Sequence, residues 1–275
     1  MAGERLDYTA AAVEAAKSVL IELMHILGEY RDDMVLVGGW IPDLLIPTSL
    51  ERHVGSIDVD VALNHKELTE AGYRMIGEIL RQHGYIQDQQ QPFIFRKDVR
   101  GQTVQVDFLA GEYGGTGKSR RTQKALDMQP RKARGCDLVF QIPPMQVAVK
   151  GKLPDGALDE VNVQVASVVP FLAMKGIALE DRRKAKDAYD IYFVLQNYPG
   201  GVDEVVKAFR PHLKLGLVQE GLKKMAGKFA SLDHVGPRDV AGFEETLDVE
   251  ERAIRQRDAF EKVRYLLKQL GIVRA

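Results

Sequence analysis

The stretch GSIDVDVALN, residues 55–64, alternates polar and apolar side chains and therefore predicts a half-buried β-strand. Successive side chains of a strand point to opposite faces, so Asp58 and Asp60 share one face with Ser56. The two carboxylates are about 6–7 Å apart along such a strand. At an effective dielectric of about 20 they repel each other by roughly 2–3 kcal/mol. A divalent cation relieves this repulsion, and hard carboxylate oxygens suit Mg²⁺.

A second stretch, TVQVDFLA at 103–110, repeats the pattern and places Asp107 on its polar face. If this strand lies beside the first, Asp107 completes a cluster of three carboxylates with Asp58 and Asp60. Such clusters hold two metal ions about 3.5–4 Å apart, on either side of an in-line displacement at phosphorus. The alternative is that the three aspartates are strand residues that only face water.

Gly38 and Gly39 directly follow MVLV at 34–37, a short buried strand, and precede a brief helix. Glycines let the backbone approach an anion closely, and the N–H groups at the start of a helix favour phosphate. Ser56 offers a hydroxyl to the same phosphates. A tight turn without a ligand is the alternative for the glycine pair, and a simple turn residue is the alternative for Ser56.

Outside these motifs, the secondary-structure pattern of the sequence changes near residue 167. The part before it mixes strand and helix patterns, and the part after Pro170 is almost entirely helical in period. We therefore expect an α+β fold with a small mixed sheet at 1–166, followed by an all-helical C-terminal domain at 167–275. The strands are expected at 34–37, 57–63, 92–97, 103–109, 138–142, 146–150 and 161–166, and the helices at 11–30, 66–83, 170–181, 184–197, 202–213, 216–229 and 248–269.

Composition excludes several classes of protein. The 275 residues carry 38 basic and 39 acidic side chains, which argues against a chain that coats nucleic acid over its whole surface but allows a local basic groove. The single cysteine, Cys136, excludes an internal disulfide framework and a zinc site built mainly from cysteines. The sequence contains no run of 18 apolar residues of the kind that predicts a membrane span. Its first residues show no apolar secretion signal, so we expect a cytoplasmic protein.

Two features of the helical part concern charge on apolar faces. Lys175 lies on one stripe with Leu172 and Leu179, so its ammonium group either reaches past the apolar surface to water or is held against an anion. Asp187 and Asp190 are three residues apart and share a helix face beside an apolar stripe, where an unpaired carboxylate is disfavoured. The ordinary explanation of the two acids is a structural ion pair with Arg183 or Lys186.

The order of these motifs resembles the nucleotidyltransferase superfamily typified by DNA polymerase β: Val37-Gly38-Gly39, then GSIDVD at 55–60, then Asp107 in a strand. The stretch LAMKGIALEDRRKAKDAYDIYFVL at 172–195 resembles the AbiEii-like nucleotidyltransferases, the toxin component of type IV toxin–antitoxin systems. The resemblance covers roughly residues 34–195, and the last 80 residues match only in being helical.

The resemblance implies a nucleotidyltransferase-type core that moves a nucleoside monophosphate from an NTP to a hydroxyl and releases pyrophosphate. Asp58, Asp60 and Asp107 would hold Mg²⁺, two ions in all, with Mn²⁺ as the alternative metal. Lys175 would join Gly38, Gly39 and Ser56 in binding the triphosphate, and Asp187 would order the active site. The acceptor implied is RNA, for example a tRNA 3′ end, and the partner implied is an antitoxin encoded alongside.

A basic stretch follows the second acidic strand. Seven lysines and arginines lie within 17 residues: Lys118, Arg120, Arg121, Lys124, Arg131, Lys132 and Arg134. Such a stretch favours contact with a polyanion such as RNA, and Arg120 and Arg121 are the candidate acceptor-binding residues. A solvated loop is the alternative. Two further functions stay open: a nucleotidyltransferase acting on a small antibiotic-type molecule, and a non-catalytic nucleotide- or RNA-binding module on the same fold.

Overall fold

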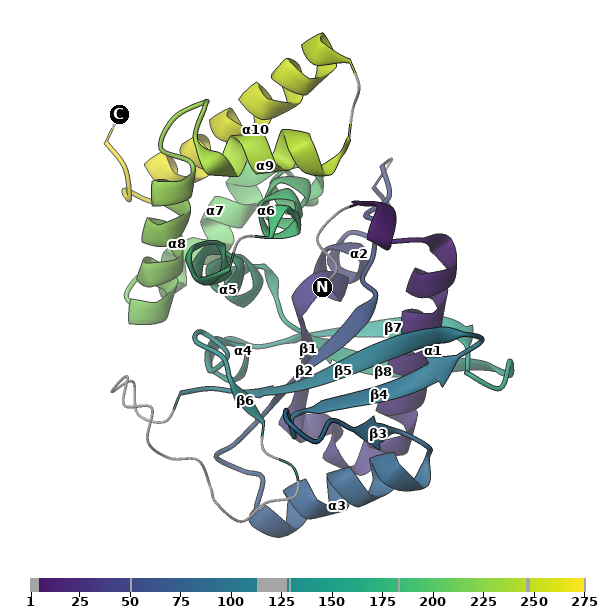
Figure 1. The fold of residues 1–275 in the computed structure, drawn as a ribbon. Helices are drawn as coiled ribbons and strands as arrows, with labels where there is room; N and C mark the ends of the chain where they lie inside the picture. Colours follow the sequence, from purple (N-terminus) through teal and green to yellow (C-terminus); the bar gives the residue numbers. More distant parts are fainter. Residues whose placement is uncertain are drawn as a thin grey trace. The chain divides into compact units, whose positions relative to one another are not determined.

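The structure is a computed structural model that describes residues 5–49, 51–112, 128, 130–182, 184–245 and 248–274 (Figure 1). Its residues form two compact units. The sheet unit comprises Thr9–Ile41 and Gly55–Ser167, and the helical unit comprises the N-terminal residues up to Tyr8, Pro42–Val54 and the chain from Val168 onward. Each unit therefore contains chain segments that are distant in sequence.

The helical unit begins at Val168, next to the expected boundary at 166/167. The division differs from the expected one in two places, because the segment up to Tyr8 and the segment Pro42–Val54 belong to the helical unit rather than to the core. The sequence pattern placed them in the core because each is next to a core element along the chain.

The sheet unit is built on a mixed sheet, as expected. In the described residues the strands follow the order β3 (Ile86–Gln87), β4 (Ile94–Val99), β5 (Gln102–Ala110), β2 (Asp58–Leu63), β1 (Met34–Val37), β8 (Leu158–Val165) and β7 (Met145–Lys152), with β6 (Arg131–Lys132) paired to the end of β5. The pairs β2/β5, β1/β8 and β5/β6 are parallel, and the other pairs are antiparallel. The strand pattern at 57–63 and 103–109 is confirmed.

Helix α1 (Ala10–Ile26) packs across the sheet and contacts β2, β4, β5, β7 and β8 (Figure 1). It begins at the N-cap residue Thr9, whose hydroxyl accepts a hydrogen bond from the Ala12 N–H, and it ends four residues before the expected limit at 30. A 3₁₀ segment, η2 (Gly28–Asp33), then leads directly into β1. Helix α3 (Glu70–Gln82) confirms the helix expected at 66–83.

The strand expected at 138–142 is wrong, because Leu138–Gln141 form the short helix α4. Leu138 and Val139 are fully buried, which explains the apolar run. A short apolar run does not by itself distinguish a buried strand from a buried helical turn.

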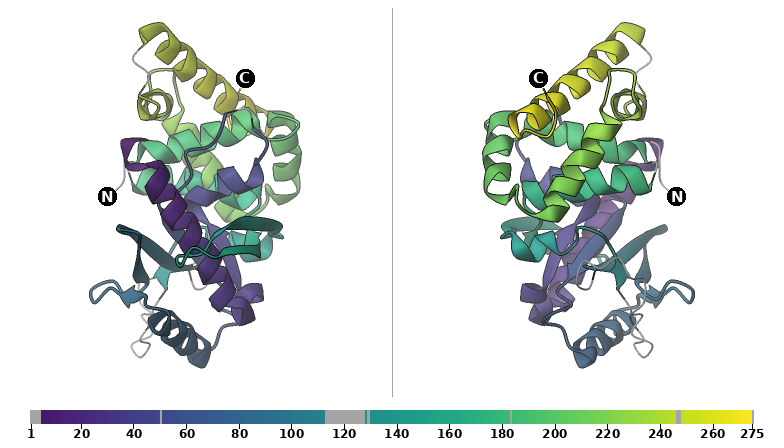
Figure 2. Two further views of the ribbon diagram at one scale, coloured as in Figure 1. Left: turned by 90° about the vertical axis from the view of Figure 1, so that its right-hand side faces the viewer. Right: turned by 90° about the vertical axis from the view of Figure 1, so that its left-hand side faces the viewer.

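The helical unit confirms the all-helical C-terminal expectation. Its helices from Val168 onward are α5 (Val168–Asp181), α6 (Ala185–Asn197), α7 (Val202–Phe209), α8 (Gly216–Lys228), α9 (Val235–Phe243) and α10 (Val249–Gln269), with the 3₁₀ turn η5 (Arg210–His212) between α7 and α8. Helix α9 lies beside α6 and α10 (Figure 2), and it was not expected from the sequence. Among the described residues, no helix combines the length and apolarity needed to cross a membrane.

Helices α5 and α8 approach each other closely at a pair of glycines. A Cβ atom built on Gly176 would lie 2.3 Å from the carbonyl oxygen of Gly221, and one built on Gly221 would lie 2.3 Å from the carbonyl oxygen of Ala173. Side chains larger than hydrogen would force the two helices apart. This contact fixes α5, which carries Lys175, within the helical unit.

Candidate functional site

Two acidic strands of the sheet unit lie side by side. Strands β2 and β5 are parallel neighbours, and Asp60 is in register with Asp107 while Asp58 is in register with Gln105. Residues in register on parallel neighbours project to the same face, so all three carboxylates occupy one face of the sheet. Val59 and Val61 project to the opposite face and are fully buried. The expectation that the second strand lies beside the first is therefore confirmed.

Short hydrogen bonds position the acids at the start of β2 and within β5. The Ser56 hydroxyl donates to Oδ1 of Asp58 at 2.6 Å, and the Trp40 indole N–H donates to the backbone carbonyl oxygen of Asp58 at 2.9 Å. The Gln105 amide donates to Oδ1 of Asp107 at 2.8 Å. Ser56 and Trp40 are buried, so these contacts hold the strand and its carboxylates in a defined position.

The glycine turn after β1 lies directly against the acidic face. Gly38 has a φ of +77°, a conformation that side-chain-bearing residues rarely adopt. A Cβ atom at position 38 would lie 2.1 Å from Oδ2 of Asp60, so only glycine leaves room for this carboxylate. Gly39 is buried in the 3₁₀ turn η3 (Gly38–Trp40), and a short helix, α2 (Ile41–Leu45), follows. The turn thus brings backbone N–H groups next to the acids.

The donor set of this face fits Mg²⁺ in its chemistry, because hard carboxylate oxygens are the ligands that this ion prefers. Protein donors hold Asp58 and Asp107, and in the described parts of the chain no three acidic, histidine or cysteine side chains converge on one metal position. The Arg131 guanidinium also lies 3.8 Å from Oδ2 of Asp107. Metal binding on this face therefore requires at least Asp58 and Asp107 to turn from their present partners.

Lys175 of α5 is held against an anion, and the anions are two carboxylates of α6. Its Nζ atom lies 2.7 Å from Oδ1 of Asp187 and 2.7 Å from Oδ2 of Asp190. Arg182 also pairs with Asp187, at 2.9 Å from Nε to Oδ2. Lys175 is 6% exposed and the acids are fully buried, so the ammonium group does not reach out to water.

The second acid of the pair, Asp190, has two more partners. Lys186 lies 2.9 Å from Oδ1 of Asp190, and His53 Nε2 donates to the same oxygen at 2.9 Å. The His53 ring stacks on Tyr189, with ring centroids 5.4 Å apart and planes 20° apart. The structural ion pair expected with Lys186 is confirmed for Asp190, whereas Arg183 lies outside the described residues. His53 lies two residues before the GSIDVD stretch, but nothing in the sequence connects it to Asp190.

The cluster of Lys175, Asp187, Asp190, Lys186 and His53 keeps its charges despite its burial. Burial alone lowers the pKa of Lys175, but Asp187 and Asp190 outweigh it and hold that pKa above its ordinary value. Burial alone raises the pKa of Asp190, but the two lysines outweigh it and hold that pKa far below the ordinary range. Burial and the neighbouring lysines lower the pKa of His53 to about 4, against the opposing effect of Asp190. At neutral pH both acids are therefore ionised and His53 is neutral.

An ammonium group has three donors, and two of those on Lys175 are engaged by carboxylates. One N–H remains for a ligand. The cluster around it carries three cations, Lys175, Lys186 and Arg182, against two carboxylates. This surplus of one positive charge is compatible with an anionic ligand, in addition to the structural role of the pairs.

The basic stretch at 118–134 falls largely on residues that the structure does not describe. Arg120 and Arg121, the candidate acceptor-binding residues, lie outside the described residues, as do Lys118 and Lys124. The end of the stretch is described: Arg131 is in register with Leu109, two residues beyond Asp107 on β5. Its guanidinium group also lies over the Phe93 ring, 5.8 Å from the centroid. One residue of the basic stretch thus lies on the acidic face itself.

Comparison with known proteins gives one result at the family level. A family model described as "Nucleotidyl transferase AbiEii toxin, Type IV TA system" matches residues 26–263. The match therefore includes the acidic strands, the glycine turn and the Lys175 cluster. Searches of curated proteins and of solved structures gave no significant match to this chain.

Proposed function

Because the chain belongs to the AbiEii family of nucleotidyl transferase toxins of type IV toxin–antitoxin systems, we propose that it is a metal-dependent enzyme that transfers an NMP from an NTP to a hydroxyl of RNA. The observation that carries the proposal is the register of Asp60 with Asp107, with Asp58 on the same face. Three carboxylates on adjacent strands repel one another, and two bound cations remove that cost while binding substrate phosphates.

In this proposal Asp58 and Asp60 bind both Mg²⁺ ions, or Mn²⁺ in their place, and Asp107 completes one of the two sites. When bound, the metal supplies a positive charge that neutralises the phosphates and lowers the pKa of the attacking hydroxyl. Asp107 takes the proton of the acceptor hydroxyl. The hydroxyl oxygen then attacks the α-phosphorus, and the bond between the α-phosphorus and pyrophosphate breaks. The backbone of Gly38 and Gly39 and the Ser56 hydroxyl bind the triphosphate.

Lys175 and Asp187 complete the proposed machinery. The remaining N–H of Lys175 donates to a phosphate oxygen of the NTP, while Asp187 fixes the ammonium group in place. A tRNA 3′ end is the proposed acceptor, with Arg120 and Arg121 as candidate contacts. An antitoxin is the proposed partner, which follows from the type IV toxin–antitoxin family.

The experiment that tests the proposal incubates the full chain with each of the four α-³²P-labelled NTPs, Mg²⁺ and total RNA. We expect label in RNA from at least one NTP, and no label when EDTA replaces Mg²⁺. An Asp60→Asn variant, purified identically, is the control for contaminating transferases. The absence of labelled RNA with all four NTPs under conditions where the chain is folded would contradict the acceptor assignment. Label on a supplied aminoglycoside instead would favour the small-molecule alternative.

A further inference from the structure

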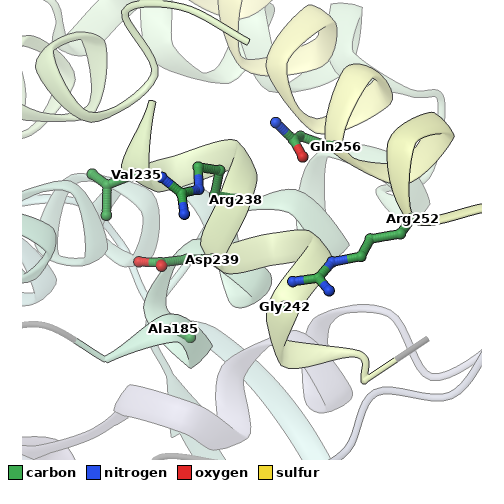
Figure 3. Close-up of a pocket in the computed structure, with 7 residues that line it drawn as sticks. All are labelled: Ala185, Val235, Arg238, Asp239, Gly242, Arg252 and Gln256. Atoms are coloured by element: carbon green, nitrogen blue, oxygen red, sulfur yellow. The ribbon is translucent and has the colours of Figure 1, made fainter. Parts of the chain in front are cut away.

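The helical unit contains a pocket of about 600 Å³ that the proposed transfer reaction does not use (Figure 3). It lies between α9 and α10, and Ala185, the first residue of α6, forms part of its wall. Arg238 comes from α9, and Arg252 and Gln256 come from α10. The volume is within the range of about 300–1,000 Å³ typical of sites for small organic ligands.

Two arginines, Arg238 and Arg252, line this pocket. Within the described ranges, the guanidinium groups of Arg238 and Arg252 form no hydrogen bond or ion pair with another residue, and both side chains are exposed. Arg255, one turn from Arg252 on the same helix, shows the contrast: it pairs with Glu244 at 2.7 Å and lies over the Tyr192 ring. The charges of Arg238 and Arg252 thus contribute little to the stability of the unit and remain available to a ligand.

The other polar groups of the pocket, Asp239 and Gln256, do not cancel the positive charge of the two arginines. Asp239 is the one acid in its lining, and burial raises the pKa of this carboxyl despite the opposing charges of Arg238 and Lys228. Among the lining residues, two guanidinium groups therefore accompany one carboxyl group, and Oδ1 of Asp233 lies 3.4 Å from the Gln256 amide nitrogen. The Gln256 amide is held in place, since it donates to the carbonyl oxygen of Leu232 at 2.9 Å. The start of α6 at Ala185 has no side-chain cap, so the positive end of its dipole adds to the field.

We propose that this pocket binds phosphate groups of a nucleotide or of a nucleic-acid backbone. Guanidinium groups present a planar fork of N–H donors that matches phosphate oxygens. Two such forks from different helices suit a ligand with more than one phosphate, and the pocket volume exceeds the space that a single small anion fills. The inference does not depend on the proposed transfer reaction, because no residue of the pocket belongs to that machinery.

The test compares Arg238→Gln, Arg252→Gln and the double variant with the wild-type full chain. Arg257→Gln is the matched control, since Arg257 is exposed on α10 and does not line the pocket. Binding of a fluorescein-labelled 12-nucleotide RNA and of ATP is measured in EDTA over a range of salt concentrations. We expect the affinity of the double variant to fall by about tenfold or more at low salt. For RNA the log–log salt slope should decrease by about 0.7 for each phosphate that the variant no longer binds.

The outcomes separate the sources of phosphate. Loss of RNA affinity assigns the pocket to backbone phosphates, and loss of ATP affinity alone assigns it to a free nucleotide; either result supports the proposal. Unchanged binding of both probes overturns it, as does an equal loss in Arg257→Gln. Melting temperatures of all variants should match the wild type, because the substituted arginines have no partners within the described chain. Binding in EDTA is measured without transfer, so failure of the proposed function is recognised separately.

Discussion

At the scale of single residues, Asp58 and Asp60 are the most informative positions. They lie on the same face of one strand, and Asp107 is in register with Asp60 on the next strand. In the proposed metal site, Asp58→Asn or Asp60→Asn would remove a ligand shared by both ions, so we expect transfer to fall by roughly 10³-fold. The metal-free protein should be as stable as the wild type or more so, because a source of like-charge repulsion is removed. Single-turnover transfer rates and thermal melts in EDTA measure the two effects.

Asp98→Asn is the matched control for both variants, because it removes one exposed carboxylate from strand β4, in register with Thr103, which is four residues from Asp107 along β5. Its transfer rate should equal that of the wild type. Full activity of Asp58→Asn would contradict the metal assignment.

Lys175 has both a structural and a proposed binding role, and the two are separable. Lys175→Met leaves Asp187 and Asp190 with one cation fewer in a buried setting, so we expect a loss of about 3–5 kcal/mol in the free energy of unfolding. Lys186→Met removes an equally buried cation from Asp190 and should also destabilise the protein. Only Lys175→Met is expected to raise the KM for NTP, measured well below both melting temperatures.

The comparison of the two lysine variants decides the role of Lys175. An equal effect of both on KM would show that Lys175 acts only through the ion cluster. From its place between Leu172 and Leu179, the sequence left two alternatives for the Lys175 ammonium group, water or an anion. It did not reveal that the anion consists of two carboxylates of the same chain.

At the scale of secondary-structure elements, a sequence pattern predicted its element correctly when the pattern was long and its period was clear. Alternation over six or more residues predicted β2 and β5 together with the faces on which their acids lie. The run at 138–142 failed because four apolar residues bury equally well in a helical turn. Helix α9 was missed because Gly236, Pro237 and Gly242 interrupt its helical signal, so that contacts with α6 and α10 rather than propensity stabilise it.

The turn between β1 and α2 gives a prediction at this scale. Gly38→Ala forces a residue with a side chain into a φ of +77° and places its Cβ against the Asp60 carboxylate. The backbone strain alone costs about 1–2 kcal/mol. Gly84→Ala is the matched control, because Gly84 has a φ of +80° and its Cβ would meet nothing within 4 Å. The backbone strain should lower the free energy of unfolding of both variants by a similar amount. Only Gly38→Ala should also lose transfer activity, because its side chain displaces Asp60.

Melting temperatures and initial transfer rates, measured side by side, check this pair of variants. If Gly38→Ala transfers nucleotide as fast as Gly84→Ala, the close approach of the turn to Asp60 has no role in the reaction.

At the scale of the whole molecule, the helical unit is assembled from three separate segments of the chain. The contact between His53 and Asp190 joins residues 137 positions apart. Local sequence patterns report on neighbours along the chain, so they placed Pro42–Val54 with the core that surrounds it in sequence. Such long-range contacts explain why the element types were predicted better than the composition of the units.

The burial of His53 makes the stability of the molecule depend on pH. Burial lowers the pKa of His53 from 6.5 to about 4 in the folded protein. Between these two values the unfolded chain binds a proton at this position and the folded chain does not, so stability falls as the pH drops from 6.5 towards 4. The contribution is complete above pH 6.5, and a shift of this size corresponds to about 3 kcal/mol. The pKa values of Asp187 and Asp190 are lowered from 3.8, so their contribution is lost only at lower pH.

His53→Gln isolates this effect, because glutamine keeps an N–H donor for Asp190 but does not titrate. The missing ring stacking on Tyr189 lowers the stability of the variant by an amount that does not change with pH. Urea unfolding, followed by circular dichroism at 222 nm from pH 7.5 to 4, gives the free energy of unfolding of both proteins. All other titrating groups are common to the two, so their difference reports His53 alone. We expect the wild type to lose about 3 kcal/mol more than the variant over this window. Parallel curves would mean that His53 keeps its ordinary pKa of 6.5 in the folded protein, so that below this pH three cations rather than two would balance Asp190.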